Sequence, residues 1–424
     1  MIGNTMKEII YAIFLSFFLC GLCGNAEAKK KKEVKKSIKR EVQTPYDKLF
    51  KGKKAFTVNG LMKMHLMAGK VYAEFPIELL NRDLALTSSI EDISDNGEGV
   101  VGQFAGRVNQ FRFTLQDSML QARLVRRYGV KNTGMGKNAD QIIERSNTPG
   151  IFQSYKILAY TPDKKAVVVD MTELFLESSR LTNPFPSYAG NSLYGFVQRI
   201  HKFQSQRSEL LGICGNDNSM SVHCNLGFNV DRLVLGSFMQ AKDVPVSVTV
   251  NKILMLLPED PMRPRLADSR IGVNAIIQTE LPDVCQGIKT YYITKRWRIE
   301  PVDEIRYKQG EMVDVKKPIV FYIDTLMPDS WIKYVKAGAE AWNAAFEKIG
   351  LRNVVRTELF PKDSSFDAGD IHNSVIRYAP SWMYYPQYSM HTDPRTGEIL
   401  NASVYLPANV ASYFYTSRTE DDGS

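Results

Sequence analysis

The chain has 424 residues, of which 44% are hydrophobic and 24% are charged, an ordinary composition for a globular protein. Its formal net charge is +8, but the segment 29–40, KKKKEVKKSIKR, carries eight basic residues and one acidic residue. The remainder of the chain is therefore close to neutral, and the composition excludes a broad basic face for nucleic acid.

The first 28 residues have the pattern of a signal peptide. Lys7 precedes a short apolar run, 9–23, and Ala26-Glu27-Ala28 offers small residues to a signal peptidase. The run is shorter than the roughly 20 residues that span a bilayer, and no later run is long and apolar enough to cross one. We predict export to the periplasm or the extracellular space, with no transmembrane segment after cleavage and a basic, disordered linker over 29–45.

Cleavage after Ala28 leaves three cysteines, Cys214, Cys224 and Cys285. An odd number permits at most one disulfide. In an oxidising compartment the simplest pair is Cys214–Cys224, because the two residues flank the turn-rich segment GNDNSMS, although the sequence leaves the pairing open. The alternative is a metal site of Cys214, His223 and Cys224, whose spacing matches none of the common zinc patterns.

The region from 46 to 310 favours strands. We divide it into a small N-terminal β-rich domain, 46–100, and a β-rich middle domain, 101–310. Apolar and polar residues alternate over 99–116, as in a half-buried strand. Before this strand we predict a polar lead-in over 46–54 and strands over 56–80, which are broken at Asn59-Gly60 and Ala68-Gly69. After it we predict a strand over 120–128, a hairpin over 157–170 and a short helix over 174–179. Further strands are predicted within 228–257 and over 291–299, and a linker over 303–317.

The pattern of apolar and polar residues changes in a third region, 317–424. IVFYID, 319–324, is a continuous apolar run typical of a strand covered on both faces. Apolar residues then recur with helical period over 331–349, after an N-cap at Asp329 or Ser330 and before Gly350. Strands are predicted over 353–358, 373–378 and 401–406. The fold class is therefore α+β, a β-rich N-terminal region followed by an α/β domain.

The sequence lacks the spaced residues that mark the common catalytic motifs. A zinc hydrolase places two histidines on one helix face as His-Glu-x-x-His, and none of the five histidines here has a second one three or four positions away. Nucleophile elbows, phosphate loops and dinucleotide fingerprints are also absent from the sequence. The carboxylates of Asp367, Asp370 and Asp393 are expected to form turns or caps, and Trp331 and Trp342 are expected to be core residues.

The turn DPRTGE, 393–398, has two interpretations. It is either a plain hairpin turn or the turn that delivers 401–406 as an edge strand able to pair with an extended peptide.

Four segments together resemble the start of the catalytic domain of bacterial metzincin-like zinc-dependent metalloproteases, namely KPIVFYID, AWNAAFEKIG, SVIRYAP and DPRTGEIL. These proteases are exported and carry two poorly characterised domains before the catalytic domain; GKVYAEFPIELLNRDLALTSSI, KAVVVDMTELFLES and YITKRWRIEP resemble those upstream parts. The resemblance covers about 56–406. It implies an incomplete metzincin-like domain over 317–424.

Membership of that family implies zinc, a glutamate base and peptide hydrolysis by metal-activated water. The His-Glu-x-x-His helix that follows in the family is missing from this sequence, so we assign no catalytic residue, no metal ligand and no cofactor to the chain itself. The family implies one carried-over element, the edge strand that would bind an extended peptide or protein substrate: Asn401, Ala402, Ser403, Val404, Tyr405 and Leu406.

The sequence therefore favours a truncated relative of an exported zinc metalloprotease, inactive by itself. The alternative is a non-enzymatic exported protein that binds a partner through its β-rich domains; an active hydrolase of another class lacks any catalytic constellation. In the family, the helix over 331–349 would share its core with the zinc helix. We thus expect some of Trp331, Trp342 and Phe346 to be uncovered, and the part after Pro318 to be loosely packed.

Overall fold

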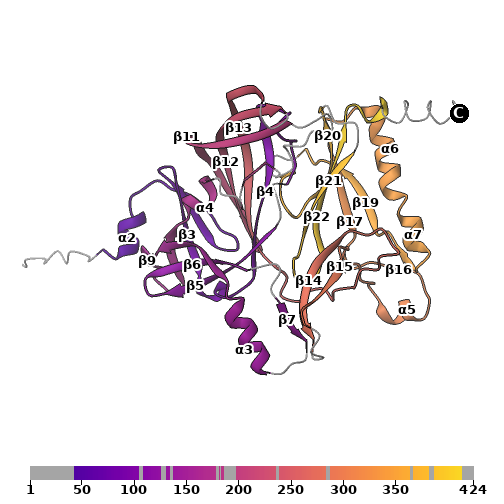
Figure 1. The fold of residues 1–424 in the computed structure, drawn as a ribbon, viewed down its shortest axis with the longest axis horizontal. Coiled ribbons are helices and arrows are strands. Elements are labelled where there is room, and N and C mark those ends of the chain that lie inside the picture. Colours follow the sequence, from indigo (N-terminus) through magenta and orange to yellow (C-terminus); the bar gives the residue numbers. More distant parts are fainter. Residues whose placement is uncertain are drawn as a thin grey trace, which may run out of the picture. The chain divides into compact units, whose positions relative to one another are not determined.

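The computed structural model describes residues 43–412, except for 105–107, 126–129, 134–136, 178–180, 182, 186–196, 235–237, 283–286, 363–365 and 382–385. Residues from Thr44 onward form one compact unit (Figure 1), which is rich in strands and has few helices, so the predicted α+β class is confirmed. The predicted signal peptide, 1–28, and the linker, 29–45, lie outside the described residues apart from 43–45. Nowhere in the described part of the chain is a helix long and apolar enough to cross a membrane.

A five-stranded sheet opens the unit. Its strands are β1 (Phe56–Val58), β2 (Lys63–Met67), β3 (Lys70–Pro76), β10 (Ala166–Asp170) and β9 (Ala159–Tyr160), in that spatial order. The predicted turn between β2 and β3 is confirmed, with positive φ at Ala68 and Gly69. The segment predicted as a lead-in instead begins with helix α2 (Pro45–Phe50), because Thr44 and Asp47 form a reciprocal capping box at its start.

The predicted hairpin over 157–170 is confirmed as β9 and β10. Its turn has positive φ at Lys164, and Thr161 and Asp163 hydrogen-bond across it. The predicted short helix follows as α4 (Thr172–Leu176), two residues earlier than expected, and it buries Leu174 and Phe175 against the sheets.

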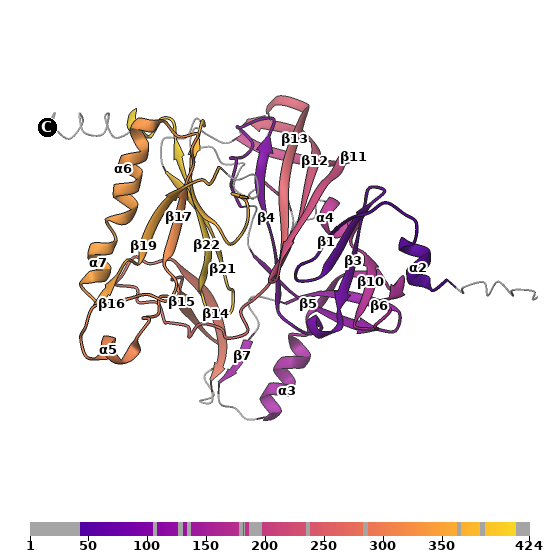
Figure 2. The same ribbon diagram turned by 180° about the vertical axis from the view of Figure 1, so that it is seen from behind.

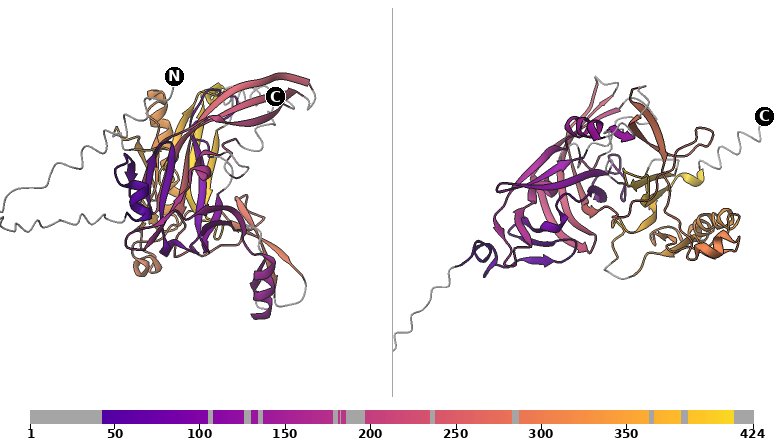
Figure 3. Two further views of the ribbon diagram at one scale, coloured as in Figure 1. Left: turned by 90° about the vertical axis from the view of Figure 1, so that its left-hand side faces the viewer. Right: turned by 90° about the horizontal axis from the view of Figure 1, so that it is seen from below.

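The largest sheet has seven strands in the order β11-β12-β13-β4-β5-β6-β8. Its first three strands are unusually long and form antiparallel pairs (Figure 3, where their rose-coloured ends reach outward past the other strands in the left view). The bounds are β11 (Val197–Asn216), β12 (Ser219–Val234), β13 (Phe238–Leu256), β4 (Leu84–Ile93), β5 (Asn109–Gln116), β6 (Met119–Leu124) and β8 (Gly150–Lys156).

One hydrophobic core joins these two sheets. Met64 and Phe75 of the first sheet pack in the same cluster as Phe113, Val222 and Leu254 of the second. The ranges 46–100 and 101–310 therefore share a core, and β3 pairs with β10 across the boundary between them.

Smaller elements lead to the C-terminal part. A three-stranded sheet joins β15 (Lys289–Thr294), β14 (Ala275–Pro282) and β7 (Val130–Thr133), with α3 (Lys137–Ser146) after β7. The predicted linker over 303–317 instead contains α5 (Glu304–Lys308), which Asp303 caps, and β16 (Val313–Asp314), which pairs with β18 (Leu351–Arg352).

The C-terminal sheet has the order β19-β17-β20-β22-β21. The predicted strands are present as β17 (Ile319–Ile323), β19 (Val355–Leu359), β20 (Ser374–Ala379) and β22 (Ile399–Pro407), which are parallel to one another. At one edge, β21 (Gln387–Thr392) is antiparallel to β22. The predicted helix over 331–349 is two helices, α6 (Asp329–Glu340) and α7 (Asn343–Glu347), and ends at Gly350 with positive φ. Its N-cap is Pro328, not Asp329 or Ser330.

The cysteine pair expected from the sequence is wrong, because Cys214 and Cys224 are both free. Cys214 lies opposite Ser221, which is three residues from Cys224 on β12, so the two cysteines point to opposite faces of the sheet. Cys224 is buried beside the Phe175 carbonyl, whereas Cys214 is exposed. Three residues of strand separate them by about 10 Å, beyond the reach of a disulfide. Cys285 lies outside the described residues.

Candidate functional site

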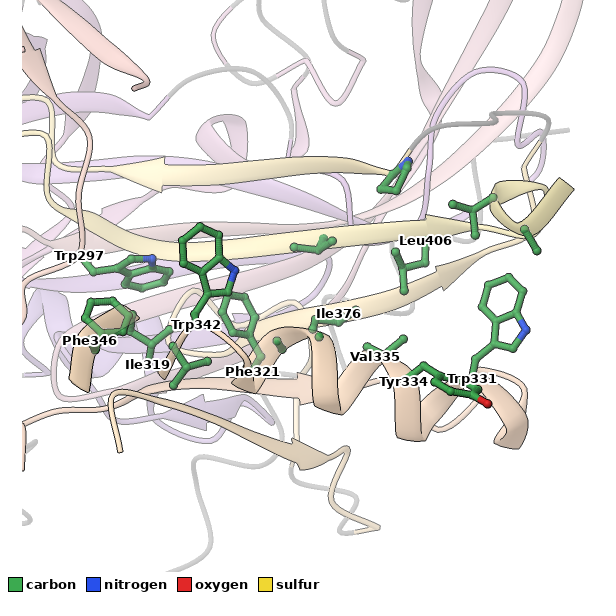
Figure 4. A pocket seen from close by; sticks show the side chains of 17 residues that line it. Trp297, Ile319, Phe321, Trp331, Tyr334, Val335, Trp342, Phe346, Ile376 and Leu406 are labelled. Atoms are coloured by element: carbon green, nitrogen blue, oxygen red, sulfur yellow. The ribbon is translucent and has the colours of Figure 1, made fainter. Parts of the chain in front are cut away.

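An apolar groove of about 820 Å³ lies between the C-terminal sheet and helices α6 and α7 (Figure 4). Figure 2 shows these helices running beside the sheet. The helices contribute aromatic and small residues, and the strands contribute aliphatic ones. The groove is lined by Trp297, Ile319, Phe321, Trp331, Tyr334, Val335, Gly338, Ala339, Trp342, Phe346, Val355, Ile376, Pro386, Val404, Leu406, Val410 and Ala411.

The helical side of the groove is the apolar stripe that the sequence predicted. Trp331, Val335 and Trp342 project from the helices toward the strands (Figure 4). Neither helix buries a single residue, and Tyr334 and Trp342 are 68% and 66% exposed. The core assignment of Trp342 is therefore wrong, and the expectation that part of this stripe lies uncovered is confirmed.

Trp331 and Phe346 are only half-buried. Trp331 meets Tyr378 edge-on at 5.8 Å, and Phe346 packs against the small cluster around Val313 and Val354. Val335 and Ala339, between them, are also half-buried against Ile323, Met327 and Ile376, so the helices rest on the sheet while Tyr334 and Trp342 stay exposed.

The predicted substrate strand, Asn401–Leu406, is not an edge strand. It forms the centre of β22, which is hydrogen-bonded to β20 on one side and to β21 on the other. The six residues divide by the alternation of a strand. Val404 and Leu406 face the groove, while Asn401, Ser403 and Tyr405 are buried on the opposite face; Ala402 is half-buried.

The edge of this sheet is β21 instead. Its first residues, Gln387 and Tyr388, are exposed, and among the described residues no backbone hydrogen bond joins its outer side to another strand. The turn at 393–398 connects β21 to β22, so the hairpin interpretation of DPRTGE is confirmed. Strand β21 was not predicted from the sequence, so the predicted edge strand lies one strand too far along the chain.

The other face of the C-terminal sheet packs on the seven-stranded sheet. His391 of β21 hydrogen-bonds the hydroxyl of Thr87 on β4 at 2.5 Å and stacks on Phe104. The hydroxyl of Tyr405 donates to the Gly102 carbonyl at 2.8 Å. Burial lowers the pKa of His391 to about 3, so the imidazole is neutral at physiological pH.

The loop carboxylates act as turn formers, as predicted. Asp367, Asp370 and Asp393 each accept a hydrogen bond from the backbone N–H two residues later. Asp393, which is fully buried, also forms an ion pair with the half-buried Arg395. None of these contacts places a carboxylate in the groove.

The cluster of Cys214, His223 and Cys224 does not form, because Cys224 faces the core. His223 instead meets Glu91 of β4, with Nδ1 2.9 Å from Oε1, and Asp367 lies beside them. The sequence gives no signal for this grouping, since its members are far apart in the chain. The other four histidines lie elsewhere with separate partners: His65 with Glu74, His201 with Glu98, His372 with Asp370, and His391 with Thr87.

Two regions of the chain match family models. Residues 43–93 match a "Domain of unknown function (DUF5118)", and residues 102–302 match a "Domain of unknown function (DUF5117)". No curated protein and no solved structure matches the chain. Neither family model extends beyond residue 302, so the helices and strands that form the groove fall outside both.

Proposed function

We propose that this chain is the front part of an exported zinc-dependent metalloprotease, in which the groove beside α6 and α7 receives the helix that carries the zinc ligands. The observation that carries the proposal is the groove itself: a continuous apolar surface between a sheet and a helix pair. The resemblance implies that the segment 331–349, which forms one side of it, shares its core with the zinc helix of the family. The chain contains no His-Glu-x-x-His, so by itself it is expected to hydrolyse no peptide.

The size and chemistry of the groove suit a helix. An α-helix with side chains is about 10–12 Å wide, so about 820 Å³ accommodates roughly two turns. The aromatic rings of Tyr334 and Trp342 would cover an apolar stripe on the incoming helix. Covering a few hundred Å² of apolar surface at about 25 cal/mol per Å² contributes several kcal/mol, which is sufficient to hold the helix in place.

We assign substrate binding to β21, and no longer to β22. An extended peptide can add to an exposed strand through main-chain hydrogen bonds, and β21 offers the free edge beside Gln387 and Tyr388. The buried end of β21, anchored through His391, keeps this edge in a fixed position. In this arrangement the sheet aligns the peptide, and the incoming helix supplies the metal chemistry.

Two measurements test the proposal. The first is to read the DNA directly downstream of the Ser424 codon; the proposal expects codons for His-Glu-x-x-His to follow. The second compares the present chain with the extended one on a quenched-fluorescent peptide library with Zn²⁺. The extended chain should hydrolyse peptides until EDTA is added, and the present chain should not. Absence of the motif in every frame would sink the proposal, as would EDTA-sensitive hydrolysis by the present chain alone.

A matched pair of variants links the activity to the groove. Trp342→Glu places a charge where the helix would pack, whereas Leu326→Glu changes a residue that is 83% exposed and lies outside the groove. In the extended chain, Trp342→Glu should strongly lower hydrolysis, while Leu326→Glu should leave it unchanged. Equal activity of the two variants contradicts the role assigned to the groove.

A second candidate function is binding without catalysis, favoured by one observation. Strand β11 is a 20-residue edge of the seven-stranded sheet, and most of its residues are exposed or half-buried. Long edge strands are templates for an added strand from a partner. Extended-peptide binding that survives Trp342→Glu and is abolished by a proline at an outward-facing β11 position would favour this candidate over the first.

A further inference from the structure

The face of the seven-stranded sheet that packs against the C-terminal part gathers three metal-ligating side chains from distant parts of the chain. They are Glu91 of β4, His223 of β12 and Asp367 of the loop before β20, and one ligand atom from each lies within 4.8 Å of the other two. This group is separate from the groove and plays no part in the proposed protease function.

The sheet positions two of these side chains by its register. His223 lies opposite Asn251 of β13, and Asn251 lies opposite Ser89 of β4, so these side chains share one face. Glu91 is the extra residue of a β-bulge, because Ile90 pairs with Val250 and Asp92 with Thr249. Bulges re-aim side chains and are over-represented at functional sites; here the bulge accompanies the contact between Glu91 and His223 Nδ1.

The third side chain arrives on a loop that lies directly on the sheet. A Cβ at Gly369 would come within 3.1 Å of the Ser89 hydroxyl, so even an alanine there would require a small shift of its neighbours. Asp367 Oδ2 accepts a hydrogen bond from Asn251 Nδ2 at 3.0 Å. The loop thus brings a second carboxylate to Glu91 and His223.

A second observation at the same place indicates a missing ligand. Asn251 is fully buried, and its side-chain oxygen has no hydrogen-bond partner among the described residues. The nitrogen of the same amide donates to Asp367, so the unpartnered oxygen belongs to a side chain that contacts the cluster. Buried polar groups are nearly always satisfied, and an amide oxygen is an acceptor that can coordinate a cation.

Glu91 and Asp367 bring two carboxylates into one cluster, and Asp367 accepts hydrogen bonds from the Gly369 N–H and from Asn251 Nδ2. Two carboxylates held together in a half-buried site repel each other, and a divalent cation would relieve that repulsion.

We propose that Glu91, His223 and Asp367 bind one divalent transition-metal ion of the zinc type, which fastens the loop around Asp367 to the seven-stranded sheet. One imidazole nitrogen and two carboxylate oxygens form a common zinc ligand set, and the imidazole disfavours Ca²⁺ and Mg²⁺. Zinc bonds of about 2.0–2.2 Å place neighbouring ligand atoms roughly 3.3 Å apart. Nδ1 of His223 and Oε1 of Glu91 are 2.9 Å apart and share a hydrogen bond, so on binding they would lose its proton and separate slightly, while Asp367 would move inward.

The test is a Zn²⁺ titration of the full, chelator-stripped chain against a competing chromophoric chelator. The expected result is one tightly bound Zn²⁺ per chain, with much weaker Ca²⁺ and Mg²⁺ binding and an affinity that falls as His223 is protonated. Glu91→Gln, His223→Gln and Asp367→Asn should each weaken binding by more than about 100-fold, since ligand loss exceeds the 10–100-fold effect of outer partners. Zn²⁺ should raise the Tm of the wild-type chain and not of these variants.

His372→Gln is the matched control. Its Nδ1 likewise contacts a carboxylate, Asp370 Oδ1 at 2.7 Å, but it does not belong to the cluster. This variant should bind Zn²⁺ as the wild type does. Asp367→Asn keeps the shape of the loop, so circular dichroism can confirm its fold even if another variant misfolds. The proposal is overturned by the absence of stoichiometric binding, by undiminished binding in folded Asp367→Asn, or by an equal loss in His372→Gln.

Discussion

The neutral imidazole of His391 should make the stability of the protein fall in acid. Burial lowers its pKa from 6.5 to about 3 in the folded chain. The unfolded chain therefore binds this proton first as the pH falls, and stability is lost between about pH 6.5 and pH 3. Each pH unit in that window costs about 1.4 kcal/mol. Lowering the pH from 7.5 to 4.5 should thus remove roughly 3 kcal/mol through this one residue.

The assay is urea unfolding at pH 7.5, 5.5 and 4.5 for the wild type and for His391→Gln. The amide of glutamine retains a polar partner for Thr87 and does not titrate. Other groups titrate in both proteins, so the difference between the two free energies isolates His391. The wild type should lose about 3 kcal/mol more than the variant over this range. A difference that stays constant with pH would refute the buried, neutral state of His391.

Three further predictions concern packing, backbone and dynamics. Trp342→Gln should lower the free energy of unfolding by less than about 1 kcal/mol, because the ring is 66% exposed. Phe175→Ala removes a fully buried ring and should lower it by about 3–5 kcal/mol. Similar losses for the two variants in urea unfolding would contradict the open groove. Gly397→Ala should lower the Tm more than Gly69→Ala. Both glycines have positive φ, but a new Cβ at 397 would lie 2.4 Å from the Thr294 carbonyl oxygen, whereas a new Cβ at 69 would meet no atom within 4 Å. Equal Tm values of the two variants would refute this. Amides of α6 should exchange faster than those of β12 and β13, because α6 buries no residue; equally slow exchange would contradict loose packing there.

The C-terminal elements could be predicted largely because they are local. The apolar period identified the helical segment, and Gly350 marked its end because a left-handed residue was needed there. The break between α6 and α7 was missed because the apolar period continues through it. Strand β21 was missed because Gln387–Thr392 is polar, so no hydrophobic alternation marks it. Its position at the edge depends on pairing, which no local pattern records.

The two candidate sites differ in how much of each could be predicted from the sequence. The open groove could be anticipated, because an apolar stripe on a helix needs a partner and the resembling family supplies one that this sequence lacks. The cluster of Glu91, His223 and Asp367 could not, since its members are brought together by strand register and by a loop packed on a distant sheet. A bulge at Glu91 and an unpartnered amide oxygen at Asn251 are visible only in three dimensions.

The two faces of the C-terminal sheet explain how the groove can stay open in a folded chain. On one face, Tyr405 and His391 are buried against Gly102 and Thr87 of the upstream region. On the other face, two buried clusters lie under the helices, one around Ile323, Met327 and Ile376 and one that includes Ile319, Val354 and Val355. The sheet is therefore held on both faces, while Trp342 of the helical stripe stays exposed. An incoming helix would add burial to a sheet that is already in place, and under the proposed function the upstream region has the role of supporting that sheet.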